Sequence, residues 1–199
     1  MKKGKKYAII GDSGSGKSTL INLLVGNKRD YEGEILLDRK DYKGINRKSL
    51  PHVMSVIMQF PYLFRETVEE NFTLGRKISP DIFDKSIRIA CADDFVFNKL
   101  DTIYDKNLSG GQQERLSVAR ELMGTKPILV MDESTASVDK KTALAVEKNI
   151  LENPDLTVIM ITHYLYDETQ NYLDEVIHLG QGMILSIIMC KHSSRVEEY

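Results

Sequence analysis

Apolar residues along the chain follow two patterns. Four short runs are β-prone and apolar almost throughout, as strands buried in a sheet are. These runs cover residues 6–10, 52–59, 126–132 and 156–162. In residues 16–26, by contrast, Leu20, Ile21 and Leu24 share one face of a helix that ends at Gly26. Strands that alternate with helices predict an α/β fold with a mostly parallel sheet.

A glycine-rich motif lies between the first predicted strand and the first predicted helix. Residues 11–19, "GDSGSGKST", match the pattern G-x-x-x-x-G-K-[ST]. Its glycines allow backbone N–H groups to converge on phosphate oxygens, Lys17 adds a cation near the β and γ phosphates, and Ser18 offers a hydroxyl to Mg²⁺. The motif predicts a nucleoside triphosphate site formed by Gly11, Asp12, Ser13, Gly14, Ser15, Gly16, Lys17, Ser18 and Thr19.

Polar residues follow the other three runs. Gln59 closes the second, Asp132 and Glu133 end the third, and His163 follows the fourth. Because open α/β sheets bind ligands at the carboxyl ends of their strands, we expect these side chains beside the phosphate loop. Asp132 suits Mg²⁺, and Glu133 suits a base that orients or deprotonates water. Adjacent strand side chains point to opposite sides, so the two acids are expected to serve separate roles.

Composition narrows the possible partners. With 27 basic and 29 acidic residues, the net charge of −2 gives no bulk reason to expect nucleic acid or an anionic membrane surface. The apolar stretches are far shorter than the roughly 20 residues that cross a bilayer, and the start of the chain does not read as a secretory signal. Cys91 and Cys190 are expected to be reduced cytosolic thiols.

A second glycine pair occurs more than ninety positions after the phosphate loop, in "NLSGGQQERLSVAR" at 107–120. Ser109 is placed to cap a helix over about 111–124. The buried stripe of that helix is expected to contain Leu116, Ala119, Leu122 and Met123. A plain capped helix accounts for the stripe but not for the glycine pair.

Taken together, these motifs resemble the nucleotide-binding domain of ATP-binding cassette (ABC) transporters, over nearly the whole chain. The family's order is kept: the phosphate loop; Gln59 in "VIMQFPYLF", the Q-loop; "LSGGQ" at 108–112, the signature; "ILVMDE"; "STASVD" at 134–139, the D-loop; and His163, the switch histidine. "LSGGQ" is the most specific of these motifs. The resemblance implies an ATPase that uses ATP and Mg²⁺.

The resemblance also implies a domain plan and site roles. We expect a P-loop NTPase (RecA-like) core over 1–60 and 125–190, an inserted helical subdomain over 61–124, and a disordered tail over 191–199. Within the helical part, helices are expected to start at Thr67, with Glu70 three residues on, and at Ser79. The implied catalytic residues are Lys17, Gln59, Glu133 and His163, and the implied Mg²⁺ ligands are Ser18, Gln59 and Asp132.

The resemblance explains the second glycine pair through a partner. In this family the signature turn of one subunit completes the site of another, so Ser109, Gly110, Gly111 and Gln112 would face the γ-phosphate of a second ATP-binding domain, identical or different. Asp139 belongs to the D-loop. "FPYLFRETVEENF" looks most like the exporter branch. This implies a transmembrane domain as partner and a peripheral position at the cytoplasmic face of the cell membrane.

The chain also departs from the family pattern. It begins about ten residues before the phosphate loop, so the usual N-terminal antiparallel strands, and the aromatic residue that stacks on adenine, are expected to be absent. Tyr7 is expected in the core, and "SIIMC" at 186–190 is expected to extend a strand. Two alternatives to a transport ATPase stay open: a truncated cassette that binds nucleotide weakly, with a regulatory or no transport role, and a soluble ABC ATPase outside transport.

Overall fold

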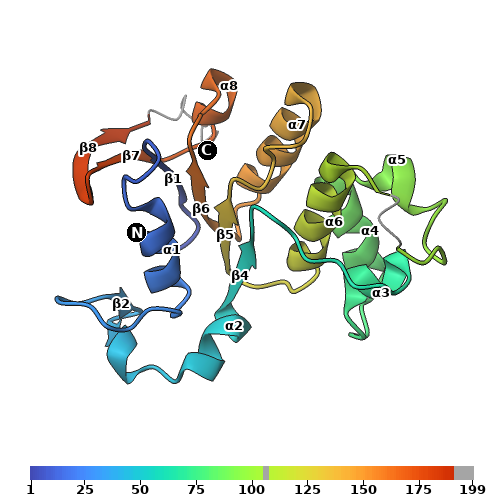
Figure 1. Cartoon of the computed structure of the whole chain (residues 1–199), viewed down its shortest axis with the longest axis horizontal. Helices are drawn as coiled ribbons and strands as arrows, with labels where there is room; N and C mark the ends of the chain where they lie inside the picture. Colours follow the sequence, from blue (N-terminus) through green and yellow to red (C-terminus); the bar gives the residue numbers. More distant parts are fainter. Residues whose placement is uncertain (105–107, 191–199) are drawn as a thin grey trace, which may run out of the picture.

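The computed structural model describes residues 1–104 and 108–190; the predicted disordered tail, 191–199, lies outside the described residues. Its centre is a six-stranded sheet with the order β4-β5-β6-β1-β7-β8 (Figure 1). Neighbouring strands from β4 to β7 are parallel, and β8 is antiparallel to β7. The strands are β1 (Lys6–Ile10), β4 (Met54–Ile57), β5 (Ile128–Asp132), β6 (Thr157–Thr162), β7 (Glu175–Gly180) and β8 (Met183–Met189). The predicted α/β class is confirmed.

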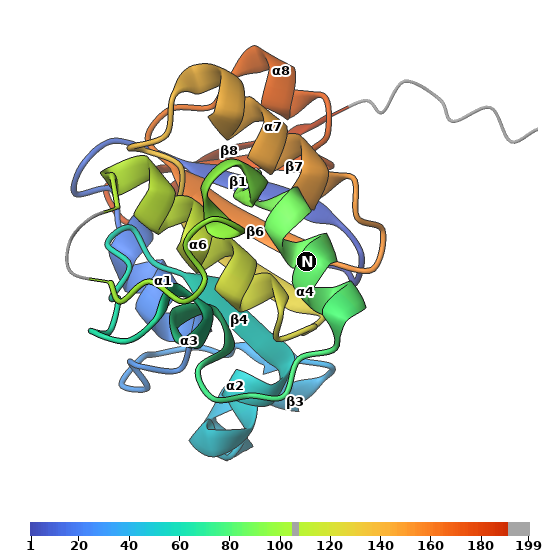
Figure 2. The ribbon, with the colours of Figure 1, turned by 90° about the vertical axis from the view of Figure 1, so that its right-hand side faces the viewer.

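Helices cover both faces of the sheet. Helix α1 lies on one side, and α6 and α7 lie on the other, where Figure 2 shows them in front of the strands. A small hairpin, β2 (Leu36–Leu37) and β3 (Lys40–Asp41), follows α1. The α-helices are α1 (Lys17–Leu24), α2 (Leu50–Val53), α3 (Val68–Thr73), α4 (Pro80–Ile89), α5 (Asp93–Val96), α6 (Gly110–Leu122), α7 (Lys140–Leu151) and α8 (Asp167–Gln170).

Alternation along the central strands builds two apolar cores. On the α1 side, Ile9 of β1, Val130 of β5 and Ile161 of β6 pack with Ile21 of α1. On the other side, the intervening residues of the same strands meet apolar side chains of α6 and α7, including Ala8, Met131, Met160, Leu116 and Val146. Because burial of a large apolar side chain contributes about 1.5–3 kcal/mol, the two layers fix the register of the strands that carry the site.

The predicted strand over 52–59 is shorter than expected. Helix α2 takes Leu50–Val53, with Pro51 in its first turn, and the strand covers only Met54–Ile57. Proline fits the first turn of a helix because it has no N–H to donate. Gln59 therefore lies two residues beyond the strand, in the loop that leads to the helical part of the chain.

Helices α3 to α6 gather beside the sheet on the side of α7 (Figure 1). Thr67 and Glu70 form the predicted capping box at the start of α3, and Ser79 precedes Pro80 at the start of α4.

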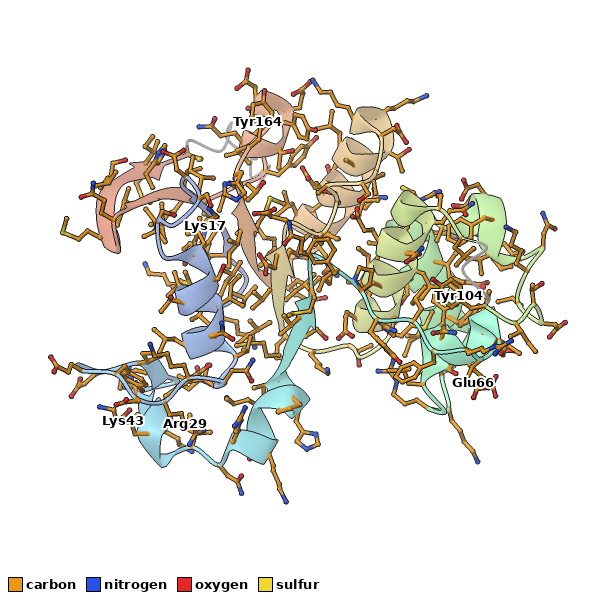
Figure 3. All side chains as sticks on the ribbon, viewed as in Figure 1. Lys17, Arg29, Lys43, Glu66, Tyr104 and Tyr164 are labelled. Atoms are coloured by element: carbon orange, nitrogen blue, oxygen red, sulfur yellow. The ribbon has the colours of Figure 1, made fainter. Side chains whose placement is uncertain are left out.

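The helical part lies apart from the phosphate loop. The backbone N–H of Tyr104 donates to Glu66 O at 2.8 Å, and Figure 3 shows both side chains in this helical part, well away from Lys17. The boundaries 1–60, 61–124 and 125–190 remain a prediction.

Two further predictions concern β1, inside the sheet, and β8, at its edge. Tyr7 is 1% exposed and belongs to the core, and its hydroxyl accepts from the backbone N–H of Lys2 at 2.6 Å. Strand β8 contains residues 186–189 of the predicted extension "SIIMC", and Cys190 follows the strand. All seven residues of β8 are exposed, although six of them are apolar.

Candidate nucleotide site

The phosphate loop joins the end of β1 to the start of α1, as predicted. Gly11 is required by close packing, since a Cβ there would lie 2.4 Å from Leu179 O. Gly14 and Gly16 have φ values of 79° and 105°, which residues with a Cβ rarely adopt. The loop is tied to the turn between β7 and β8 by a hydrogen bond from the N–H of Gly182 to Ser15 O. The first N–H groups of α1 have no partner within the helix, so they are available to an anion.

Lys17 is held at the centre of this loop and is 7% exposed. Its ammonium group donates to Gly11 O and to Asp12 O, the latter at 3.0 Å. It also lies 3.2 Å from Nδ1 of His163. Because an ammonium group only donates, this contact assigns Nδ1 as the acceptor and leaves the proton on Nε2.

Glu133 is held from two sides. Nε2 of Gln59 donates to one carboxylate oxygen of Glu133 at 2.7 Å, and Nε2 of His163 lies 3.0 Å from the other. Three residues from the ends of β4, β5 and β6 therefore meet, as predicted from the sheet edge. The side chain of Glu133 is 18% exposed, so it still reaches solvent.

The two adjacent acids do not point apart as strand alternation predicts. β5 ends at Asp132, and Glu133 follows with a φ of 47°, its N–H bonded to Ile161 O at 2.9 Å. Because Glu133 is outside the strand, the alternation rule does not apply to it, and both acids line one cavity. Burial, and then the neighbouring Glu133 charge, raise the pKa of Asp132.

This cavity has a volume of about 300 Å³ and combines one buried cation with acidic, amide and hydroxyl groups. A triphosphate fits the glycine loop, the helix N-terminus and Lys17. Mg²⁺ fits the Ser18 hydroxyl, the Asp132 carboxylate and the Gln59 amide oxygen, which are ligands it prefers. The lining residues are Ser13, Gly14, Gly16, Lys17, Ser18, Thr19, Gln59, Asp132, Glu133 and His163.

The signature residues do not join this cavity within the chain. Ser109 caps α6 and forms a capping box with Gln112, as its position predicts, and α6 begins one residue earlier than expected, at Gly110. Of the predicted stripe, Leu116, Ala119 and Met123 are buried and Leu122 is partly buried.

Close approach of the D-loop explains the two signature glycines within the same chain. A Cβ on Gly111 would lie 3.0 Å from Ser137 O, and a Cβ on Gly110 would lie 3.3 Å from the Ser137 Cβ. The backbone N–H of Ser137 also donates to both carboxylate oxygens of Glu114, at 3.1 and 2.9 Å. The glycine pair therefore has an intrachain packing role, while its role toward a partner stays a prediction. Sequence analysis missed Glu114 as the residue that holds the D-loop. Asp139 caps α7 by accepting from the N–H of Thr142 at 3.0 Å.

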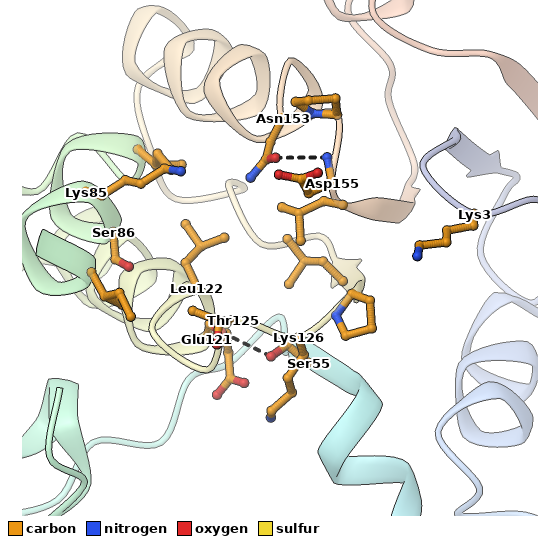
Figure 4. Close-up of a pocket in the computed structure, with 16 residues that line it drawn as sticks. Lys3, Ser55, Lys85, Ser86, Glu121, Leu122, Thr125, Lys126, Asn153 and Asp155 are labelled. Atoms are coloured by element: carbon orange, nitrogen blue, oxygen red, sulfur yellow. Dashed lines mark hydrogen bonds between the residues drawn. The ribbon is translucent and has the colours of Figure 1, made fainter. Parts of the chain in front are cut away.

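A second cavity, of about 480 Å³, lies away from the phosphate loop (Figure 4). It is walled by the end of α6, by α4 and by the segments that precede β5 and β6. Apolar residues such as Leu122 and Leu156 line it together with lysines such as Lys85 and Lys126. This second cavity shares no residue with the cavity that contains Lys17 and Glu133. The candidate nucleotide site is therefore the cavity of about 300 Å³ and not this larger one.

The fold and the site together define a P-loop nucleotide-binding protein. A family model described as ABC transporter matches residues 1–136, so the chain belongs to the ABC transporter family. ATP-dependent lipid A-core flippases of Salmonella paratyphi A and of Escherichia coli strain K12 are each 35% identical to it over 191 residues. Those matches cover 92% of this chain and 32% of the flippases, so the chain spans about a third of their length.

The fold agrees with a solved structure. A bacterial Atm1-family ABC exporter with ATP bound matches with a TM-score of 0.85 and 31% sequence identity. The match covers 96% of this chain and 34% of the exporter chain.

Proposed function

We propose that this chain is the ATP-binding and ATP-hydrolysing part of an ABC exporter. The observation that carries the proposal is the position of Glu133, which Gln59 and His163 hold in the cavity that also contains Lys17. The family membership and the ABC exporter fold support it.

In this proposal the described groups divide the chemistry of hydrolysis. Lys17 binds the β and γ phosphates, and Ser18, Asp132 and Gln59 would hold Mg²⁺, which would neutralise charge on the phosphates. Glu133 orients a water molecule and accepts its proton while the water oxygen bonds to the γ phosphorus. The bond from that phosphorus to the β–γ bridging oxygen breaks, which gives ADP and phosphate. His163 fixes Glu133 through its Nε2–H.

The proposal includes a composite site shared by two chains. Ser109 and Gly110 are exposed at the start of α6, yet neither lines the cavity of its own chain. The cap and the helix N-terminus suit an anion, so a γ-phosphate would reach them from a second ATP-binding domain, identical or different, in a head-to-tail dimer.

A transmembrane domain is the proposed second partner. Large apolar side chains between β4 and α3 are exposed, among them Phe60 at 83% and Tyr62 at 72%, and exposed apolar patches mark interaction sites. The relatives are named as a flippase and an exporter. In the described residues no helix is both long and apolar enough to cross a membrane. We place the chain at the cytoplasmic face of the membrane, bound to that partner.

The test is phosphate release by the purified chain with Mg-ATP. Glu133→Gln should abolish release and retain ATP binding, because the amide keeps the shape of the side chain but cannot accept a proton. Equal rates for Glu133→Gln and the unchanged chain would contradict the assignment of Glu133. A chain that binds ATP weakly and releases no phosphate would support a cassette with a regulatory role instead. The burial of Tyr7, which removes it as a base-stacking residue, favours that alternative.

A further inference from the structure

A buried carboxylate lies between the two loops that carry Glu133 and His163. Glu147, on α7, is 6% exposed. It occupies the buried stripe of that helix with Ala143, Val146 and Ile150. A carboxylate is rarely buried unless it is paired or hydrogen-bonded, so its place in an apolar stripe calls for a specific role.

The two oxygens of Glu147 bind two different segments. Oε1 accepts from the hydroxyl of Thr135 at 2.9 Å, and Oε2 accepts from the hydroxyl of Thr169 at 2.5 Å. Thr135 lies two residues after Glu133, and Thr169, which is 2% exposed, lies in α8, six residues after His163. One side chain therefore connects the segments on either side of the Glu133–His163 contact.

We propose that Glu147 is a positioning residue for hydrolysis, which holds the segments carrying Glu133 and His163 at their working separation. The inference rests on the proposed function, since it assumes that Glu133 and His163 act together on water. Burial raises the pKa of this carboxyl, against the two hydroxyl hydrogen bonds. Burial of the charged carboxylate therefore costs free energy, at a position where an apolar residue would complete the buried stripe of α7 without that cost.

The test compares Glu147→Leu with Glu147→Gln. Leucine removes both hydrogen bonds, so we expect kcat to fall by about tenfold to 100-fold, because a misplacement of about 1 Å can cost about 100-fold. KM for ATP should stay within about twofold of the unchanged chain. Glutamine accepts from one threonine and donates to the other, so it should restore kcat to within about twofold. Glu152→Gln, at the exposed end of α7, is the matched control and should change neither value.

A double-mutant cycle separates positioning from folding. Thr169→Val should lower kcat on its own and add little to Glu147→Leu, because both remove the same link. In the nucleotide-free protein, hydrogen exchange should accelerate in residues 133–139 and 163–169 and stay unchanged elsewhere. Full kcat in Glu147→Leu, or a rise in KM with exchange accelerated throughout the chain, would overturn the inference.

The proposed function and this inference fail in different ways. If the unchanged chain releases no phosphate, hydrolysis itself is wrong, and the positioning role falls with it. If the unchanged chain hydrolyses ATP while local exchange and kcat are unaffected in Glu147→Leu, only the role of Glu147 is wrong.

Discussion

Nε2 of His163 lies 3.0 Å from Glu133 Oε1, while Nδ1 of the same ring lies 3.2 Å from the ammonium group of Lys17. The imidazole therefore bridges the proposed base and the phosphate loop. If a bound γ-phosphate moved the ammonium group of Lys17, the contact of Lys17 with His163 would change. The position of His163 relative to Glu133 would then change with it.

His163→Ala should lower the rate of phosphate release by about 100-fold, a usual contribution of a group that serves acid–base chemistry. ATP affinity should change less than threefold, because the phosphates are held by the loop and Lys17. Single-turnover kinetics would separate the two effects. The assignment fails if binding is lost together with the rate.

Lys17→Ala should weaken Mg-ATP binding by about 100-fold or more, which corresponds to about 2.7 kcal/mol. The lysine is the cation that the described loop directs at the phosphates. Calorimetric titration measures the change. Lys28→Ala, beyond the C-terminal end of α1 and outside the cavity lining, serves as the control. An equal loss in both variants would point to a general charge effect.

Ser109→Arg should spare nucleotide binding by one chain and block hydrolysis, because the residue would act on the phosphate of another chain. A mixture of Ser109→Arg and Lys17→Ala chains provides the stricter measurement. A mixed dimer contains one site with intact Lys17 and intact Ser109, so activity should reappear on mixing. If Ser109→Arg alone hydrolyses ATP normally, the composite site is wrong.

Asp139 should make stability depend on pH. The N–H of Thr142 and further hydrogen bonds hold the pKa of this capping carboxyl below its usual value of 3.8. A lowered pKa in the folded state means that the contribution is present above the unfolded value and is lost as the pH falls below it. The comparison is with Asp139→Asn, which caps a helix about as well but cannot titrate.

Thermal unfolding of both chains between about pH 6 and pH 2 measures this difference. The unchanged chain should lose its advantage over Asp139→Asn as the pH falls through and below about 3.8. A constant difference across that range would show that the charge of Asp139 does not contribute.

Short sequence motifs and the common direction of parallel strands were enough to predict several parts of the site. The phosphate loop, the caps at Thr67 and Ser109, and the meeting of Gln59, Glu133 and His163 follow from short motifs and from the common direction of parallel strands. Such rules depend on residues close in the sequence or on one edge of a sheet.

The remaining features depend on contacts between distant segments. The positive φ of Glu133 accompanies a hydrogen bond from its N–H to Ile161 O, and the D-loop lies against Gly111 although β5 separates the two in the sequence. Glu114 and Glu147 were missed for the same reason. A signal for Glu147 was present, since it follows Ala143 by four residues on a helix whose other members at that spacing are apolar.

The exposed strand β8 has a consequence for how the protein behaves in concentrated solution. Residues 183–189 contain no charge, and in the described chain β8 has β7 as its sheet neighbour on one side. Natural sheets usually guard such an edge with lysine or proline. The outer edge of β8 is therefore a template on which another extended peptide can hydrogen-bond as a seventh strand, and Ile187→Lys would place a charge on that exposed strand.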